Sequence, residues 1–335
     1  MKILLDHPCP FLLAHGGFQI QIEQTRAALK LIGLDAEYLQ WWNPAQPADI
    51  IHYFGRPNIG YLQQARQKGI KVILAELLTG VGSRAAWALK LQKTAIAASQ
   101  ALLPPVATYR FGWQSFKSAD ACVALTDWEA RLMHDVFGAP VEKIHVVPNG
   151  VEELFFPGQP VPRDQWLVCT ATITERKRPL ELAQAAVLAR TPVWFVGKPY
   201  AGTDPYARRF QQFAAQNLEF VRYEGDVSDR AQLARIYREA RGFVLLSTME
   251  SLSLSALEAA ASGCPLLLSD LPWARDTFGS NATYVPVSPP EITAGHLKNF
   301  YAAAPSLPAP PRPQTWLEVA HQLRAVYEKV LSTSS

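Results

Sequence analysis

Two glutamates, Glu250 and Glu258, lie between two uninterrupted apolar runs at 242–246 and 265–268. Uninterrupted apolar runs of this length are typical of parallel strands that are covered on both faces. The segment between them is therefore predicted to be a crossover helix, with Glu250 in the loop before it and Glu258 early in it. The first turn of a helix attracts anions through its free backbone N–H groups and the positive end of its dipole. The two carboxylates would bracket such a site, which suits a phosphate ligand with hydroxyl groups at both ends.

Each glutamate also has a purely structural interpretation. An acidic side chain near a helix N-terminus stabilises the helix by a few tenths to about one kcal/mol. Glu258, however, is flanked by Leu257 and by the alanines at 259–261. Burying an unpaired carboxylate among apolar side chains is costly, so we expect a polar group to contact Glu258.

Alternating strand and helix patterns must position these two glutamates. In the first half of the chain, strands are predicted at 2–5, 36–39, 50–54, 71–75 and 121–125, with helical or irregular stretches between them. The second half repeats the alternation, with strands predicted at 166–170, 193–196 and 219–223 before the glutamate segment. This alternation is typical of an α/β fold with parallel, helix-covered sheets.

Length and turn signals divide the chain into two domains. The chain has 335 residues, 49% of them hydrophobic, which is enough for two cores. Turn-forming residues at 148–150 predict the boundary, so the first domain covers 1–150 and the second covers 151–312. The proline-rich segment 305–313 predicts an irregular, semi-rigid connector. The remaining segment, 313–335, contains a helical pattern and is expected to pack back toward the first domain.

Charge and cysteine content narrow the class of protein. The net charge of +3 is small and the charged residues are interspersed, so nucleic acid is not an expected partner. The four cysteines are far apart and lack the spacing of a zinc site or a disulfide framework. The apolar run at 2–5 is too short for a signal peptide, which argues against a periplasmic two-lobed sugar-binding protein. We therefore expect a cytoplasmic protein with at most peripheral membrane contact.

Several motifs occur in a recognisable order along the chain. Glycines at 16–17 are followed by the turn at 147–151, by Lys177, by the two glutamates, by Gly263-Cys-Pro265 and by the helical segment 316–320. Together they resemble the retaining GT-B glycosyltransferases of family four, or glycosyl transferases group one. The resemblance covers nearly the whole chain and is strongest at 121–270. It implies an α/β GT-B fold of two Rossmann-like domains whose parallel sheets face each other across a cleft that holds a nucleotide-sugar donor.

The resemblance also implies roles for residues at matching positions. Glu250 would bind hydroxyls of the donor sugar, Glu258 would accept hydrogen bonds from the ribose, and Lys177 would neutralise the departing diphosphate. Backbone N–H groups before and in the first helical turn would bind phosphate oxygens, and 225–227 would hold the nucleobase through backbone contacts. Glu250 and Lys177 are the predicted catalytic residues. The full predicted donor-binding set is Gly16, Gly17, Arg176, Lys177, Gly225, Asp226, Val227, Glu250, Ser251, Leu252, Ser253, Leu254 and Glu258.

The activity that this resemblance implies is transfer of a hexose-type sugar from a nucleotide diphosphate sugar to an acceptor hydroxyl, with retention at the anomeric carbon. The acceptor is an unidentified sugar, lipid or small molecule. Neither a metal nor a resident cofactor is expected, because the chain has no clustered aspartate pair of the metal-dependent kind. A GT-B epimerase is a further alternative, whereas a phosphorylase would need a much longer chain with a pyridoxal phosphate lysine.

Two departures from the family pattern favour a different class of function. Thr172 stands where an arginine usually precedes the lysine by five residues, and Arg176 and Arg178 are the candidates to replace it. The segment 72–78 lacks the expected catalytic-centre histidine, and Glu76 is its nearest ionisable residue. His15 and His52 are alternatives on the acceptor side, although Glu76 and both histidines also have structural interpretations. The alternative function is a weak or inactive GT-B relative that binds a sugar or nucleotide as a regulatory or assembly partner.

Basic and aromatic residues share one part of the first domain. The stretch 79–119 has no acidic residue but contains Arg84, Lys90, Lys93, Arg110 and Lys117 together with Trp87, Tyr109, Phe111 and Trp113. Such a mixture can lie on an anionic membrane surface at the inner face of the membrane, or beside a phosphate-bearing acceptor. The alternative is a solvated basic face with its aromatic side chains packed inward. Trp41 and Trp42 could equally form a sugar-stacking platform or a small core.

Overall fold

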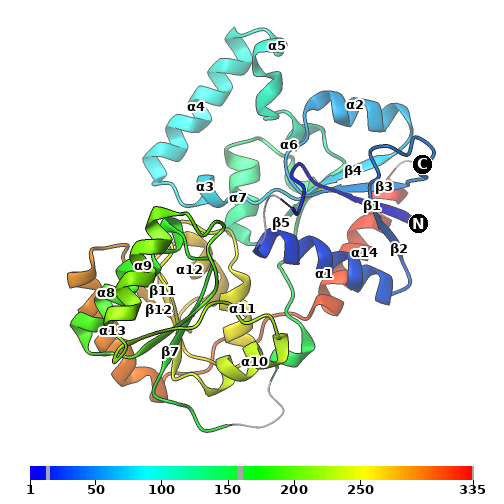
Figure 1. Cartoon of the computed structure of the whole chain (residues 1–335). Helices are drawn as coiled ribbons and strands as arrows, with labels where there is room; N and C mark the ends of the chain where they lie inside the picture. The colour runs from blue at the N-terminus through cyan, green and yellow to red at the C-terminus, as the bar shows by residue number, and fades with distance from the viewer. Residues whose placement is uncertain (13–15, 157–160, 334–335) are drawn as a thin grey trace. The chain divides into compact units, whose positions relative to one another are not determined.

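The computed structural model describes residues 1–12, 16–156 and 161–333. The chain divides into two compact units, one formed by Met1–Asn149 with Trp316–Ser335 and the other by Gly150–Thr315. Each unit contains a six-stranded parallel sheet with helices on its faces (Figure 1). The predicted α/β fold with two parallel sheets is therefore confirmed. Within the described residues, no helix combines the length and the apolar character needed to cross a membrane.

In the first unit, the strand order is β2-β1-β3-β4-β5-β6, and every neighbouring pair is parallel. The strands are β1 (Lys2–Asp6), β2 (Asp35–Tyr38), β3 (Ile50–Tyr53), β4 (Lys71–Leu74), β5 (Ala121–Ala124) and β6 (Ile144–Val146). The helices are α1 (Gly17–Leu31), α2 (Ile59–Gln67), α3 (Thr79–Gly82), α4 (Ala86–Leu102), α5 (Pro105–Thr108), η1 (Tyr109–Phe111), α6 (Ser115–Ser118), α7 (Asp127–Asp135) and η2 (Val141–Lys143).

The last helix, α14 (Trp316–Ser332), belongs to the first unit although it comes from the other end of the chain. It packs against α1 (Figure 1). Its buried side chains recur every three or four residues, which is the period of one helix face. Tyr327 on this face lies with its hydroxyl oxygen 2.7 Å from Nδ1 of the buried His52 in β3.

In the second unit, the strand order is β12-β11-β10-β7-β8-β9, again all parallel. The strands are β7 (Leu167–Thr170), β8 (Val193–Val196), β9 (Val221–Tyr223), β10 (Gly242–Leu245), β11 (Leu266–Ser269) and β12 (Thr283–Val285). The helices are η3 (Glu153–Phe155), η4 (Glu175–Lys177), α8 (Pro179–Ala189), α9 (Pro205–Gln216), α10 (Arg230–Glu239), α11 (Leu254–Ala261), α12 (Pro272–Phe278), α13 (Pro290–Ala303) and η5 (Ala304–Ser306).

The two apolar runs around the glutamates form the neighbouring strands β10 and β11, joined by the crossover helix α11. Both strands are buried along their whole length, because α helices cover both faces of the sheet.

The proline-rich connector departs from its expected irregularity at its start. Pro305 and Ser306 lie in the short helix η5, where proline is tolerated because the first turn of a helix needs no N–H donor from it. The second unit extends to Thr315, which forms a parallel β-bridge with Val151.

Candidate functional site

The strand order of the second sheet reverses at β7, which lies between β8 and β10. At such a reversal, the loops after the two central strands separate to opposite faces and leave a crevice at their carboxyl ends, where ligands of open α/β sheets bind. The loop after β7 carries Arg176 and Lys177, and the loop after β10 carries Glu250. The topology therefore brings these predicted site residues to one place.

A compact cluster of charges occupies this place. Oε1 of Glu250 accepts hydrogen bonds from Nζ of Lys177 and from Nη1 of Arg176, the latter at 3.1 Å. Nη1 of Arg176 also donates to the carbonyl oxygen of Met249 at 2.8 Å. The two loops are joined directly as well, because the backbone N–H of Thr248 donates to the carbonyl oxygen of Arg176 at 2.9 Å. Two cations and one carboxylate thus contact one another at the carboxyl ends of β7 and β10.

The carboxylate of Glu250 is ionised in this cluster. The residue is only 8% exposed, and burial by itself would raise its pKa. The charges of Lys177 and Arg176, with the hydrogen bond from Lys177, outweigh burial and lower the pKa of Glu250 below its ordinary value. The two cations therefore stabilise the charged form of this buried carboxylate.

The structure distinguishes the two arginines that could replace the missing cation at Thr172. Arg176 points toward Glu250, whereas Nη2 of Arg178 donates to the carbonyl oxygen of Ser288 at 2.6 Å. The cause is local, because Arg178 has a left-handed backbone, with φ of 56°, between η4 and α8. This conformation turns its side chain away from that of its neighbours. Arg176 is therefore the second cation of the cluster.

The N-terminus of α11 follows the Glu250 loop directly. Ser253 caps the helix, with its hydroxyl oxygen accepting from the backbone N–H of Ala256 at 3.3 Å. Within the described part of the chain, no acceptor is found for the backbone N–H groups of Leu252, Ser253 and Leu254. Unsatisfied N–H groups at a helix start bind anions readily. Ser251, which was also predicted at this site, is buried in the same loop.

Both carboxylate oxygens of Glu258 have protein partners. Its Oε1 accepts from Nη2 of Arg230 at 2.5 Å, and its Oε2 accepts from the hydroxyl of Tyr237 at 3.2 Å. Arg230 also forms an ion pair with Glu152, and Tyr237 shares a hydrogen bond with Thr170 at the end of β7. Burial raises the pKa of Glu258 despite the opposing charge of Arg230. The polar contact expected for this carboxylate thus comes from Arg230 and Tyr237.

Sequence reasoning missed Arg230, Tyr237 and Glu152, although one signal was present. Arg230 is the first residue of α10, directly after the capping Asp229. A cation at this position opposes the helix dipole, so a compensating carboxylate was to be expected nearby. Tyr237 gave no such signal, because its position in the helix has the apolar spacing of a core residue.

The predicted nucleobase loop follows β9, and the strand β8 separates β9 from β7 in the sheet. Gly225 has φ of 91°, and its carbonyl oxygen accepts from the backbone N–H of Gly197 at 2.9 Å. A side chain at Gly197 would lie 2.0 Å from the carbonyl oxygen of Ala171, so only glycine allows these loops to pack. Asp226 forms an ion pair with Lys198 at 2.8 Å, and Val227 follows it in the same loop. The loops after β7, β8 and β9 therefore form one wall beside the charge cluster.

Gly16, Gly17 and Glu76 follow the strands β1 and β4, so they lie at the carboxyl edge of the first sheet. Gly16 caps α1 with φ of 126°, a backbone conformation that favours glycine, and Gly17 begins the helix. His15 lies outside the described residues. Oε2 of Glu76 accepts from Nε of Arg56 at 2.6 Å, and burial raises the pKa of Glu76 more than Arg56 lowers it. Burial lowers the pKa of His52 to about 3, and its ring contacts Tyr327 on α14, so His52 is part of the core.

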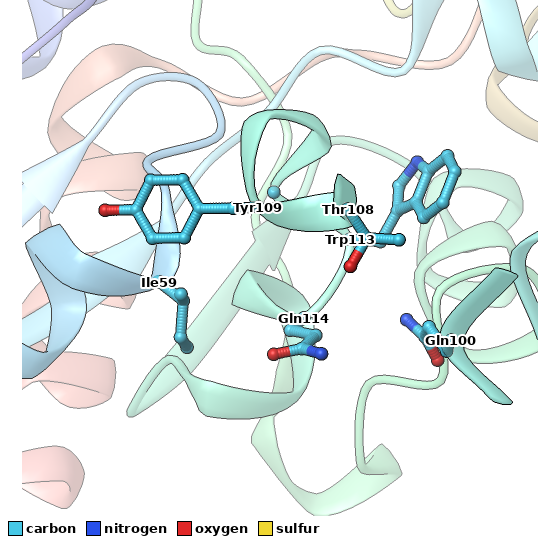
Figure 2. Close-up of a pocket in the computed structure, with 7 residues that line it drawn as sticks. Ile59, Gln100, Thr108, Tyr109, Trp113 and Gln114 are labelled. Atoms are coloured by element: carbon cyan, nitrogen blue, oxygen red, sulfur yellow. The ribbon is translucent and has the colours of Figure 1, made fainter. Parts of the chain in front are cut away.

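A small pocket of the first unit adjoins the basic stretch. Figure 2 shows Tyr109 and Ile59 on one side of this pocket and Gln100 on the other, with Gln114 between them. Its volume of about 30 Å³ accommodates water molecules. A site for a sugar-sized ligand needs roughly 300 Å³ or more. This pocket is therefore not the acceptor site.

Comparison with known proteins gives a consistent family. Residues 164–302 match the family model described as "Glycosyl transferases group 1", and residues 14–150 match the one described as "Glycosyl transferase 4-like domain". A D-inositol 3-phosphate glycosyltransferase of Jonesia denitrificans is 29% identical over 258 residues, which are 66% of this chain and 60% of that relative. The chain thus spans less than two thirds of the length of this curated relative.

Solved structures agree on the architecture. Sucrose-phosphate synthase from Thermosynechococcus elongatus superposes with a TM-score of 0.68 at 17% identity, with full coverage of both chains. HepE of Anabaena, solved in complex with UDP-glucose, superposes with a TM-score of 0.58 at 13% identity and covers 99% of both chains. At these identities the similarity concerns the fold, which is GT-B.

Proposed function

Because the chain belongs to the group 1 glycosyltransferases, we propose that it transfers a sugar from a nucleotide diphosphate sugar to an acceptor hydroxyl with retention at the anomeric carbon. One observation carries the proposal: Lys177, Arg176 and Glu250 meet beside the unsatisfied N–H groups at the start of α11. Cations and free N–H groups suit a diphosphate, and the carboxylate suits the hydroxyls of the attached sugar.

Each group has a distinct role in this proposal. When the bond between the anomeric carbon and the diphosphate oxygen breaks, negative charge accumulates on the leaving diphosphate. Lys177, Arg176 and the N–H groups of the α11 start stabilise that charge, and they are already oriented before the reaction begins. Glu250 is then released from the two cations and accepts hydrogen bonds from the sugar. The chemistry needs no resident cofactor beyond the donor.

Glu258 is proposed to act at the ribose together with Arg230. Its carboxylate already accepts hydrogen bonds from Arg230 and Tyr237, so the protein fixes its orientation before a donor arrives.

The Gly225–Val227 loop, at the end of β9 in the same unit, is the proposed contact for the nucleobase. UDP is the first nucleotide to test, because the HepE structure contains UDP-glucose.

The competing function is a GT-B relative that binds the nucleotide sugar without turnover. Two departures motivated it, the missing cation at Thr172 and the missing histidine at 72–78, and Arg176 answers the first by supplying a positive charge to the same cluster. Transfer is therefore the function that the geometry supports best.

A thermal-shift and turnover assay tests the proposal. Wild type is mixed with UDP, GDP and ADP and with their sugar derivatives, since a ligand at a hundred times its Kd adds about 2.7 kcal/mol of stability. Slow donor hydrolysis is then measured for wild type, Glu250→Ala and Lys177→Ala. We expect stabilisation by one nucleotide series and hydrolysis that both variants lose while they remain folded. The absence of any shift would reject the proposal, and binding with no turnover of any donor would favour the competing function.

The first unit, which would hold the acceptor, is proposed to contact the inner face of an anionic membrane through residues 79–119. Helix α4 buries only Leu89 and Ile96, and it exposes Trp87 by 68% and Leu91 by 61%. Lys90 and Lys93 are exposed on the same helix, and the stretch contains no acidic residue. Exposed indole and leucine side chains beside cations are typical of helices that lie in a lipid interface.

Vesicle sedimentation tests this contact. We expect the protein to bind vesicles of phosphatidylglycerol more tightly than vesicles of phosphatidylcholine. Lys90→Glu with Lys93→Glu should abolish the difference, whereas the matched pair Lys30→Glu with Lys68→Glu should not. Equal binding by all variants would reject the membrane contact.

A further inference from the structure

Trp41 and Trp42 occupy the two central positions of a tight turn after β2. The turn is closed by a hydrogen bond of 2.9 Å from the backbone N–H of Asn43 to the carbonyl oxygen of Gln40. The two tryptophans are 73% and 80% exposed, so they do not form a small core. Turn corners ordinarily carry glycine, proline, asparagine, aspartate or serine. The requirements of the turn therefore do not explain two neighbouring, exposed indole rings at this corner.

The turn is built to be rigid. Gln46 accepts from the backbone N–H of Gln40 at 2.8 Å and donates to the carbonyl oxygen of Tyr38 at 3.0 Å. The side-chain amide of Asn43 donates to the side-chain oxygen of Gln40 at 3.0 Å. These bonds hold the turn in one conformation, so binding a ligand there costs little conformational entropy.

A buried carboxylate fixes the first indole. Asp6, at the end of β1, is only 2% exposed. Its Oδ1 accepts from Nε1 of Trp41 at 3.1 Å and from the backbone N–H of His7 at 2.8 Å, and its Oδ2 accepts from the hydroxyl of Tyr61 at 2.6 Å. The N–H of Trp41 is thus engaged inside the protein while most of the residue remains in solvent. This arrangement presents the indole to a ligand in a fixed orientation.

The position of the turn agrees with a binding role. It follows β2 and is attached to the end of β1 by a bond of 2.9 Å from the backbone N–H of Leu39 to the carbonyl oxygen of Leu5. The turn therefore lies at the carboxyl edge of the first sheet, where open α/β sheets bind their ligands. Gly16, at the start of α1, follows the same strand β1.

Charge and size restrict the ligand. The turn itself, 40–46, contains no charged residue, so it offers no cation to a phosphate or an anionic lipid and no carboxylate to a cationic ligand. Two indole rings bury at most roughly 250 Å² each, well below the ~800 Å² per partner of a stable protein interface. A small neutral molecule with an apolar face fits both limits.

We propose that the Trp41–Trp42 turn is a stacking platform for a pyranose ring of a saccharide acceptor. One face of a pyranose presents C–H groups that pack on an indole, while its hydroxyls remain available to water and to polar side chains. The proposal rests on the proposed function for its biological meaning, because it assigns the acceptor of that reaction to the saccharides. The binding itself can be measured without any turnover.

Saturation-transfer NMR tests the platform directly. The probes are methyl glucoside, methyl mannoside and methyl N-acetylglucosaminide in the millimolar range. We expect transfer to the ring protons of at least one probe in wild type, and a loss of about fivefold or more in Trp41→Ala with Trp42→Ala, which corresponds to about 1 kcal/mol. Trp41→Phe with Trp42→Phe keeps aromatic rings and should retain most of the signal. Leu31→Ala, another exposed apolar residue of this unit, is the matched control and should behave as wild type.

Three results would overturn the platform. They are no transfer to any probe in wild type, equal transfer in wild type and the double alanine variant, and loss of vesicle binding or of self-association in that variant in place of saccharide binding. Stabilisation by nucleotide sugars is measured on the same proteins. If the double alanine variant keeps that stabilisation but loses saccharide binding, both proposals stand. If wild type binds saccharide but no nucleotide, only the proposed function fails.

Discussion

The ammonium group of Lys177 donates a hydrogen bond to the carboxylate of Glu250, 73 residues further along the chain. The pair forms because β7 and β10 are neighbours in the sheet and their following loops meet at its carboxyl edge. Within the pair, each group neutralises the charge of the other. In the proposed reaction, a diphosphate sugar replaces both halves of the pair, with phosphate at Lys177 and sugar hydroxyls at Glu250.

Removing the ammonium group should mainly affect the chemical step. In the proposed reaction Lys177 faces charge that develops on the leaving group, so Lys177→Ala is expected to lower kcat by about 10² to 10³. Lys177→Arg keeps the charge in a different shape and should recover part of the rate. Steady-state kinetics with the nucleotide sugar identified by thermal shift measures this. A change confined to KM would show that Lys177 only binds the donor.

The two arginines beside Lys177 provide a matched comparison. Arg176→Gln removes a cation that reaches Glu250, and we expect kcat/KM to fall by about tenfold, or roughly 1.4 kcal/mol. Arg178→Gln removes a cation that contacts the carbonyl oxygen of Ser288, and it should leave kcat/KM nearly unchanged. Both substitutions keep a long polar side chain, and thermal unfolding confirms the fold of each. Equal losses in the two variants would contradict the assignment of Arg176 as the second cation.

Breaking the pair between Arg230 and Glu258 should destabilise the protein. Arg230→Met leaves two carboxylates, Glu152 and Glu258, without their cation, and Glu258 is buried. The side chain of Arg230 is 32% exposed, so we expect a loss of about 2 to 3 kcal/mol, less than the roughly 3 to 5 kcal/mol that is typical of breaking a fully buried pair. Adding Glu258→Gln should restore part of the stability by removing one unpaired charge. Urea unfolding of both variants measures the difference, and an unchanged midpoint for Arg230→Met would exclude a structural role.

The buried His52 should make stability depend on pH. Its pKa is about 3 in the folded protein and 6.5 as an unperturbed group, because burial disfavours the charged ring. The unfolded chain therefore binds a proton that the folded chain does not, and stability falls as pH decreases from 6.5 toward 3. The expected slope is about 1.4 kcal/mol per pH unit from this group.

Chemical unfolding of wild type and His52→Gln between those pH values isolates the contribution of His52. Glutamine retains a polar contact for Tyr327 but does not titrate, so the difference between the two proteins should change with pH. Parallel pH profiles would show that His52 is not the group responsible.

Local sequence patterns sufficed for the architecture of this protein. The apolar runs that became β10 and β11 are uninterrupted because both faces of a parallel strand are buried, and that requirement is visible in the residues themselves. The order of the motifs along the chain was enough to predict that Lys177 and Glu250 share one site, because only a few strand orders occur in such sheets.

The partners of individual side chains depended on tertiary structure. Arg176 and Arg178 are equivalent in sequence, and a left-handed backbone at Arg178 separates them. The apolar neighbours of Glu258 in the sequence predicted that a polar group contacts it. Arg230 and Tyr237 are the contacting residues because α10 packs against α11. The sequence left open whether Trp41 lies in a core or at the surface. In the structure it lies at the surface, and its indole N–H donates to Asp6 at the end of another strand. Such pairings join residues far apart in the chain, and sequence periodicity describes only which face of its own element a residue occupies.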